Sequence, residues 1–365
     1  MNEILISGYY GFKNSGDDAL LQAITNDLKK YKKDIRIVVL SRNPKETTAV
    51  YGVRAINRMN LFSVLFALLH CRMVISGGGT LIQDGTSTKS LLYYLAIIST
   101  AKLFGKKVML YSNGIGPLKD ENIPRTKRVL DKVDVITLRD KMSYDALCAI
   151  GVSKPEIKLT ADPAFALDAA DSTAAREILN KAGVPRDRKI MGICVRPWRA
   201  LPPGFEDAVA AAADYAAEKY GFYPVFLPMQ KQNDTEIANK IIGRMKNEAC
   251  LLQADMDIPV LLAVFGEMSL CVGMRLHSLI YAAAREVPVV GLVYDPKVTG
   301  VMDYMNQRQY LDAELLAPGQ LERTIDDCME NYDQYRREIR KNVEILRKKA
   351  EENAKYAVEL FDKEC

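Results

Sequence analysis

Short apolar runs alternate with helical segments along the whole chain, and this alternation restricts the fold more than any other feature. In the first half, the pattern predicts strands at residues 4–7, 35–40, 73–76, 108–112 and 133–138. It predicts helices at residues 17–30, 89–104, 122–131 and 141–150, the first with Leu20, Ile24 and Leu28 on one face. Near-continuous apolar strands that alternate with helices are typical of a parallel sheet covered on both faces.

The same rhythm restarts in the second half after a junction helix at residues 168–181. Strands are expected at 189–195, 223–227, 268–272 and 288–293, and helices at 205–220, 234–245, 258–265 and 278–285. We therefore predict an α/β protein with two Rossmann-like doubly wound domains that face each other across a cleft, as in the GT-B fold. The predicted domains are residues 1–167 and 168–320, followed by a helical segment, 321–365, that can pack back on the first domain.

Length and composition agree with two globular domains. The chain has 365 residues, of which 48% are hydrophobic and 26% charged, and this composition excludes a disordered or collagen-like chain. The net charge of +4 is too small to indicate nucleic-acid binding. Only two histidines are present, so a histidine-rich metal site is disfavoured and we predict no metal and no cofactor.

Compartment signals favour the cytoplasm. The seven cysteines include no Cys-x-x-Cys pair, which is typical of reduced thiols in a cytosolic protein. The residues after Met1 lack the basic and apolar regions of a signal peptide. The longest apolar stretch, residues 91–100, is shorter than the roughly 20 residues that span a bilayer.

Glycine-rich turns follow the predicted strands of the first domain. The segment 8–18 matches neither the dinucleotide-binding nor the P-loop spacing, and Asp17 would repel a phosphate but suit a polyhydroxylated ligand. Ser15 is the predicted N-cap of the following helix, and a plain acidic turn remains the alternative. Gly77, Gly78 and Gly79 place bare backbone where ligands of α/β sheets bind, with Asp84 close behind. For the turn at residues 113–117, ligand binding and a simple loop remain equally open.

Cationic side chains stand at the expected strand ends. Arg139 ends a strand, where it can serve a ligand or pair with Asp140. Arg275 and His277 flank the start of an apolar helix after a glycine turn, an arrangement that suits anion binding by the arginine and proton donation by the histidine. Lys297 follows the next predicted strand and can neutralise the same anion, with an ordinary surface lysine as the alternative.

These motifs resemble those of the polysaccharide pyruvyl transferase family over most of the chain. The shared pattern comprises the 8–17 glycine segment, the glycines at 77–79, Arg139-Asp140, the Arg-x-His-Ser element at 275–278 and the Tyr-x-x-Lys element at 294–297. Within the family, the chain is most similar to the CsaB-type enzymes. These pyruvylate secondary cell wall polymers that anchor bacterial surface-layer proteins.

The resemblance implies a donor, an acceptor and their residues. Phosphoenolpyruvate would donate pyruvate as a 4,6-ketal to a sugar, typically N-acetylmannosamine on a lipid-linked cell wall precursor, with release of phosphate. The expected donor-binding residues are Arg139, Arg275, His277 and Lys297. Arg139 is in the first domain, and the other three are in the second. The expected acceptor-binding residues, all in the first domain, are Asn14, Asp17, Gly78, Gly79 and Asp84. Catalysis is assigned to His277, Arg275 and Asp17, with His277 as the acid.

Two other functions fit the same residues. A nucleotide-sugar-dependent GT-B glycosyltransferase would use the cations on a diphosphate, and a saccharide-binding protein would bind sugar without releasing phosphate. The expected location is cytoplasmic, at the inner face of the plasma membrane if the acceptor is lipid-linked. The basic segment 336–349 could touch an anionic membrane, although its interleaved glutamates favour an ordinary solvated helix. No nucleic-acid partner is expected, and the oligomeric state, the order of substrate binding and the general base are left open.

Overall fold

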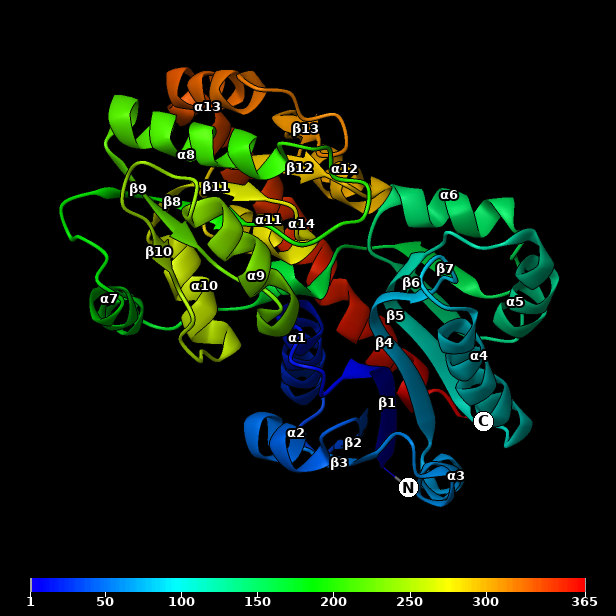
Figure 1. Ribbon diagram of the computed structural model, residues 1–365. Coiled ribbons are helices and arrows are strands. Elements are labelled where there is room, and N and C mark those ends of the chain that lie inside the picture. The colour runs from blue at the N-terminus through cyan, green and yellow to red at the C-terminus, as the bar shows by residue number, and fades with distance from the viewer. Residues whose placement is uncertain (1, 365) are drawn as a thin grey trace. The chain divides into compact units, whose positions relative to one another are not determined.

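The computed structural model describes residues 2–364, which form two compact units (Figure 1). The first unit comprises Met1–Leu167 and Leu346–Cys365, and the second comprises Asp168–Ile345. The last helix, α14 (Tyr332–Asp362), begins in the second unit and ends in the first. The C-terminal segment is therefore shared between the units.

The first unit is built on a seven-stranded parallel sheet in the order β3-β2-β1-β4-β5-β6-β7. The strands are β1 (Glu3–Tyr10), β2 (Arg36–Ser41), β3 (Arg54–Asn57), β4 (Met73–Ile82), β5 (Lys107–Ile115), β6 (Val135–Leu138) and β7 (Glu156–Leu159). The chain first builds the sheet outward from β1 to β3 and then crosses to the other side of β1 with β4. This reversal is a topological switch point, where α/β sheets bind ligands at the carboxyl ends of their strands.

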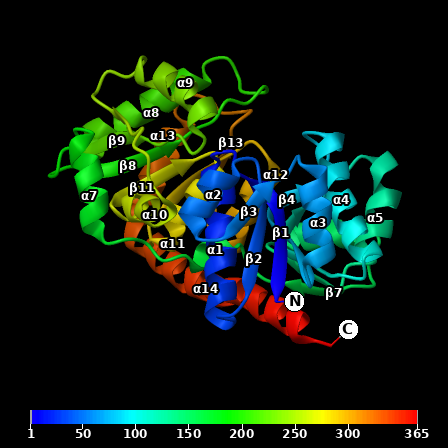
Figure 2. The ribbon, with the colours of Figure 1, turned by 90° about the horizontal axis from the view of Figure 1, so that it is seen from below.

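Helices cover both faces of the first sheet, as the apolar strands predict. They are α1 (Ser15–Tyr31), α2 (Pro44–Tyr51), α3 (Leu61–His70), α4 (Thr88–Leu103), α5 (Ile123–Leu130) and α6 (Lys141–Ala149), with 3-10 turns at Asp120–Asn122 and Pro163–Ala166. One core contains the inner sides of α3 and α4, and the other contains those of α1 and the end of α14 (Figure 2). Successive strand residues alternate between these cores, with Ile4 in one and Leu5 in the other.

The second unit repeats this plan with a six-stranded parallel sheet in the order β10-β9-β8-β11-β12-β13. The strands are β8 (Lys189–Cys194), β9 (Phe222–Phe226), β10 (Cys250–Leu251), β11 (Met268–Gly273), β12 (Val289–Val293) and β13 (Tyr310–Asp312). The helices are α7 (Ser172–Lys181), α8 (Phe205–Tyr220), α9 (Lys231–Ile242), α10 (Ile258–Gly266), α11 (Leu276–Ala284), α12 (Pro296–Tyr304) and α13 (Gln320–Glu330). Its switch point lies between β8 and β11. The prediction of two doubly wound parallel sheets is therefore confirmed.

Two local predictions in the first unit were wrong. The three glycines at 77–79 do not follow a strand but lie inside β4, because Gly77 and Gly79 pair with Tyr111 and Asn113 of β5. The N-cap of α1 is Asn14 rather than Ser15, since the Asn14 side chain accepts a hydrogen bond from the Gly16 amide. Both corrections matter for the site, because they place β4 backbone and the Asn14 side chain beside the start of α1.

Two global properties follow from the described residues. None of their helices is long and apolar enough to cross a bilayer. The six cysteines between residues 2 and 364 are free thiols, five of them buried and Cys148 exposed, while Cys365 lies outside the described residues.

Candidate functional site

Strand β4 extends beyond its neighbour β1 at the switch point of the first unit. Pairing between the two strands ends at Ser7 and Ser76, whereas β4 continues along β5. Gly78 and Gly79 have positive φ angles of +55° and +74°, which a side chain would strain. A Cβ atom at Gly79 would lie 3.3 Å from the Asp17 Oδ1 atom. The glycines thus let the start of α1 approach β4 and bring Asp17 against it.

Asn14 and Asp17 form one hydrogen-bonded pair at this position. The Asn14 Nδ2 group donates to the Asp17 carboxylate, so the predicted residues are in contact. Burial, followed by the charge of Asp18, raises the pKa of Asp17 from 3.8 to about 7, against the opposing effects of Asn14 and Arg139. Near neutral pH, Asp17 is therefore present both as an acid and as a carboxylate, which suits a group that exchanges protons with a ligand.

Arg139 is held in the same unit by two carboxylates. Its side chain is only 5% exposed, with Nε 3.1 Å from Asp140 Oδ2 and Nη1 3.8 Å from Asp162 Oδ2. The Nη2 group donates to Thr80 Oγ1 at 3.0 Å. The alternative of pairing with Asp140 is thus realised, and donor binding by Arg139 stays a prediction.

The Asp84 side chain stabilises the loop that follows β5. Its carboxylate is almost fully buried and accepts hydrogen bonds from the Lys119 amide at 2.9 Å and from Asn122 Nδ2 at 2.6 Å. These contacts attach the segment after β5 to the end of β4. Acceptor binding by Asp84 stays a prediction, because its two oxygens already serve this contact.

An aromatic platform that the sequence analysis did not single out lies beside Asp17. The rings of Tyr9 and Phe12 stack at 4.0 Å and 5° from parallel, and Tyr9 is 37% exposed. Arg58 lies against this platform, with its guanidinium carbon 5.4 Å from the Phe12 ring centre and Nη1 donating to the Gly8 carbonyl at 2.9 Å. Burial and the charge of Asp17 raise the pKa of Tyr9. The signal that could have revealed the platform is the pair of aromatic residues inside a glycine turn.

Asn113 on β5 is a second group of interest in this unit. It pairs with Gly79 through the backbone, and its side chain is completely buried. Neither its amide nitrogen nor its amide oxygen has a hydrogen-bond partner among the described residues. Buried polar groups are nearly always satisfied, so this amide is a strong candidate for contact with a polar ligand.

Arg275 and His277 lie at the switch point of the second unit, where β11 ends at Gly273. Arg275 occupies the N-cap position of α11, and His277 lies in the first turn of that helix. The Arg275 guanidinium makes two bonds to Asp234, a side chain with no solvent exposure, and its Nη2 group lies 3.4 Å from Gln230 Oε1. Asp234 therefore fixes the direction of the Arg275 side chain.

Lys297 lies just beyond the neighbouring strand β12, in the first turn of α12. Its Nζ atom is 3.1 Å from Asp295 Oδ2 and 5.3 Å from the centre of the Tyr294 ring. Arg196, which follows β8, donates from Nη1 to the Tyr294 hydroxyl at 2.9 Å, and its guanidinium carbon lies 4.8 Å from the same ring. Tyr294 thus connects two cations, of which the sequence analysis missed Arg196.

The structure assigns the predicted residues to two groups. Asn14, Asp17, Gly78, Gly79, Asp84 and Arg139 belong to the first unit, where Arg139 also influences the pKa of Asp17. Arg275, His277 and Lys297 belong to the second unit, at the carboxyl ends of two paired strands.

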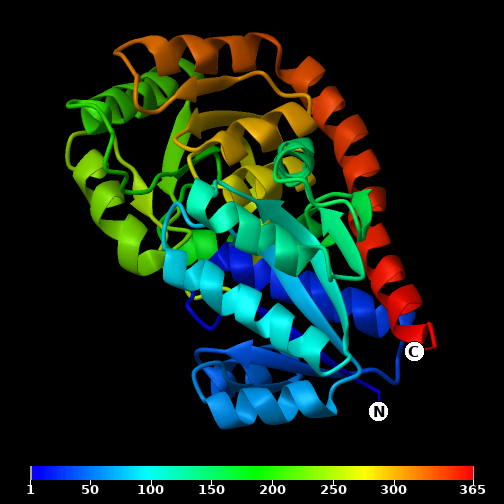
Figure 3. The ribbon, with the colours of Figure 1, turned by 90° about the vertical axis from the view of Figure 1, so that its right-hand side faces the viewer.

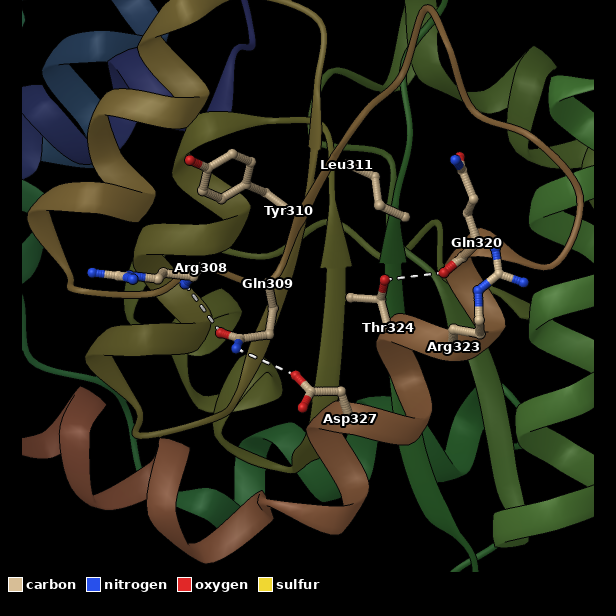
Figure 4. A pocket seen from close by; sticks show the side chains of 8 residues that line it. All are labelled: Arg308, Gln309, Tyr310, Leu311, Gln320, Arg323, Thr324 and Asp327. Carbon is tan, nitrogen blue, oxygen red and sulfur yellow. Dashed lines mark hydrogen bonds between the residues drawn. The ribbon is translucent and has the colours of Figure 1, made fainter.

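A hollow on the second unit is separate from both groups. It has a volume of about 390 Å³ and lies between β13 and α13 (Figure 4). Its lining contains none of the predicted residues, and several of its polar side chains bond locally, such as Gln309 to Asp327 at 3.4 Å. We therefore do not assign a substrate to it.

Solved structures with the same fold span the whole chain. HepE of Anabaena in complex with UDP and glucose has a TM-score of 0.67 at 13% identity, covering 98% of this chain and 99% of that chain. MnaA of S. aureus with UDP has a TM-score of 0.67 at 14% identity, covering 100% and 99%. The UDP-GlcNAc 2-epimerase of Neisseria meningitidis bound to UDP-GlcNAc has a TM-score of 0.63 at 10% identity, covering 99% of each chain. The chain therefore has the two-domain, Rossmann-like GT-B fold.

A family model supplies the more specific assignment. The model described as polysaccharide pyruvyl transferase matches residues 14–296, which is well over half of the chain and includes both groups of predicted residues except Lys297. The chain belongs to the polysaccharide pyruvyl transferase family.

Proposed function

We propose that this protein transfers pyruvate from phosphoenolpyruvate to two hydroxyls of a saccharide and releases phosphate. The observation that carries the proposal is the position of the Arg-x-His and Tyr-x-x-Lys elements at the carboxyl ends of β11 and β12. Phosphoenolpyruvate carries a phosphate and a carboxylate, so its site requires several cations. Arg275, Lys297 and Arg196 supply them within one unit, and arginine can grip either anion through two donors.

His277 is the proposed acid. It donates a proton to the methylene carbon of phosphoenolpyruvate, which leaves an oxocarbenium-like centre at C2. One sugar hydroxyl then forms a bond to C2 as its proton passes to a base, and His277 regains its proton from solvent. The second hydroxyl also bonds to C2 as the carbon–oxygen bond to phosphate breaks, and its proton leaves with the phosphate. The product is a cyclic ketal, and the reaction needs no oxidant or reductant.

The first unit supplies the proposed acceptor site. Asp17, with a pKa near 7, can accept the proton of an attacking hydroxyl, and Asn113 can bond a further hydroxyl. The Tyr9 and Phe12 platform offers a flat apolar surface for a sugar ring. By resemblance, we propose N-acetylmannosamine of a lipid-linked cell wall precursor as the acceptor, pyruvylated at O4 and O6.

A nucleotide-sugar transferase is the second candidate, because the structural neighbours were solved with UDP or UDP-sugars. Calorimetric titration separates the candidates: phosphoenolpyruvate should bind, and UDP-GlcNAc should not. Loss of one charge-assisted hydrogen bond costs about 1.5–3 kcal/mol, so Lys297→Ala should weaken phosphoenolpyruvate binding by about tenfold or more.

The matched control for that titration is Lys240→Ala. Lys240 is also on the second unit, but it is exposed and pairs with Glu236 on its own helix. It should leave donor binding unchanged. Tight binding of UDP-GlcNAc without binding of phosphoenolpyruvate would overturn the proposal in favour of the second candidate.

A further inference from the structure

One face of α3 exposes large apolar side chains to solvent. The face, called the α3 face here, consists of Leu61, Phe62, Phe66 and Leu69 of the helix together with Met59, which precedes it. Phe62 is 86% and Phe66 55% exposed, whereas Val64, Ala67 and Leu68 on the opposite side enter the core. Figure 3 shows this helix at the margin of the first unit. Because no residue from Leu61 to Leu69 is charged, α3 is apolar all round although only one side is covered.

Such a face needs a partner. Single exposed apolar residues are common on protein surfaces, but a contiguous set on one helix marks an interaction site. Leu103, the last residue of α4, is 81% exposed and extends the apolar surface near the end of α3. The Lys106 Nζ group, three residues later, donates to the Leu69 carbonyl at 2.8 Å, which places this turn beside the end of α3.

Three cations lie next to α3, Arg58 and Arg72 by sequence and Lys106 through its bond to the Leu69 carbonyl. Residues 47–119, which include α3 and α4, contain eight lysines and arginines and a single acidic residue, Asp84. Asp84 is buried and bonded to Asn122, so it does not contribute an exposed negative charge. The imidazole of His70 lies 4.0 Å from the Phe66 ring and is also exposed. The sequence around α3 therefore has an excess of cations, although Lys102 is paired with Asp134 and Arg54 lies 3.9 Å from Glu3.

We propose that the α3 face docks the protein on an anionic lipid bilayer, with Phe62 and Phe66 inserted among the headgroups and the surrounding cations facing lipid phosphates. Exposed aromatic and aliphatic residues with flanking lysine and arginine are the chemistry that binds such an interface. A second copy of the chain fits less well. A two-fold dimer through this face would bring the same cations of both copies together, and they would repel each other.

The C-terminal basic segment is the weaker membrane candidate. Arg340 and Arg336 of α14 lie 2.6 and 3.9 Å from Glu286, so part of its charge is already paired. Its mixture of glutamates and cations agrees with an ordinary solvated helix. Helix α3 itself contains no acidic residue.

The inference rests on the proposed function only for the biological source of the lipid, which would carry the sugar acceptor. Helix α3 begins at Leu61, three residues after Arg58, so the α3 face starts next to the cation that lies against the Tyr9 and Phe12 platform. A lipid-linked sugar bound at that platform would thus have an apolar surface at hand for its lipid.

The test is sedimentation of the full chain with vesicles of phosphatidylcholine and phosphatidylglycerol, without donor or acceptor. The variant is Phe62→Glu with Phe66→Glu, and the matched control is Leu315→Glu with Ile345→Glu, which alters exposed apolar residues of the second unit. We expect the wild type and the control to bind, and the α3 variant to bind at least about tenfold more weakly. Binding should also fall in pure phosphatidylcholine and at high salt.

Two results would overturn the inference. One is vesicle binding that the α3 substitutions leave unchanged. The other is absence of vesicle binding by the wild type, in which case a dimer that the same substitutions dissociate, seen by sedimentation velocity, would identify a second copy as the occupant. Circular dichroism and pyruvyl transfer to a soluble acceptor, both expected at the wild-type level, show that the variant is folded. Since the vesicles contain neither substrate, failure of the proposed chemistry leaves this readout intact.

Discussion

Asp17 should make the native protein less stable above neutral pH, and Asp17→Asn should remove that penalty. The pKa of Asp17 is about 7 in the folded chain, against an ordinary value of 3.8, because the carboxyl is buried next to Asp18. The folded state therefore holds the Asp17 proton more tightly than the unfolded state does. The stabilising effect of that proton is complete below pH 3.8 and is lost as the pH rises through 7.

The size of the effect follows from the pKa change. At about 1.36 kcal/mol per pH unit, a pKa raised from 3.8 to about 7 corresponds to about 4 kcal/mol of lost stability at pH 8 or above. Asparagine cannot ionise, so the variant should gain up to this amount at pH 8 and almost nothing at pH 4. For a unit of this size, about 2–4 °C per kcal/mol makes the gain at pH 8 a rise of about 8 °C or more in the unfolding midpoint.

The assay is thermal unfolding of the wild type and the variant, followed by circular dichroism across pH 4–8. Asp18→Asn is the matched control, because the pKa of Asp18 is raised only to about 6 and its carboxylate contacts Tyr51 instead of Gly79. Asp18→Asn should give a smaller gain and keep pyruvyl transfer, whereas Asp17→Asn should lose turnover while donor affinity stays unchanged. An Asp17→Asn effect of equal size at pH 4 and pH 8 would refute the reasoning.

Three further substitutions test the two groups of residues. Asp234→Asn should destabilise the protein by about 3–5 kcal/mol and abolish donor binding, as seen by thermal unfolding and calorimetry, because it leaves the Arg275 charge without its buried partner; unchanged stability would contradict this. Arg196→Ala should weaken phosphoenolpyruvate binding by about tenfold or more and leave the acceptor KM unchanged; the reverse pattern would remove it from the donor site. Tyr9→Ala should raise the acceptor KM by about two- to tenfold with Tyr9→Phe near wild type, and no change in KM would exclude the stacking role.

The nine inner strands of the two sheets were predictable because each is marked within its own sequence, whereas the edge strands β3, β7, β10 and β13, which are only two to four residues long, were not predicted. Runs of β-branched and aliphatic residues between helical patterns identify buried parallel strands without knowledge of their neighbours. Helix α3 escaped the prediction for the opposite reason. Its sequence is apolar on every side, so no 3.6-residue periodicity separates a buried from an exposed face.

The glycines at 77–79 show how tertiary context overrides local preference. Three glycines predict a turn, since glycine has little strand propensity. The neighbouring strand β5 supplies partners for Gly77 and Gly79, and β4 therefore continues. Ligand binding by these glycines stays a prediction, whereas close packing requires them, since a Cβ atom would lie 2.9 Å from Leu20 at Gly78 and 3.3 Å from Asp17 at Gly79.

For the candidate site, the sequence predicted which residues follow the ends of strands but not which side chains they contact. Arg275, His277 and Lys297 could be identified because each follows a strand of the parallel pattern. Their partners could not be identified, since they come from distant parts of the chain. Asp234 lies 41 residues before Arg275 in the sequence, and Arg196 lies 98 residues before Tyr294.

The most direct test of the proposed chemistry is identification of the product. The purified protein is incubated with phosphoenolpyruvate and an N-acetylmannosamine-containing acceptor, phosphate is quantified, and the saccharide is analysed by mass spectrometry and NMR. We predict one phosphate released for each cyclic pyruvyl ketal formed across O4 and O6, and loss of both in a folded His277→Ala variant. A saccharide that gains no pyruvyl group from phosphoenolpyruvate but is extended from a UDP-sugar would contradict the account.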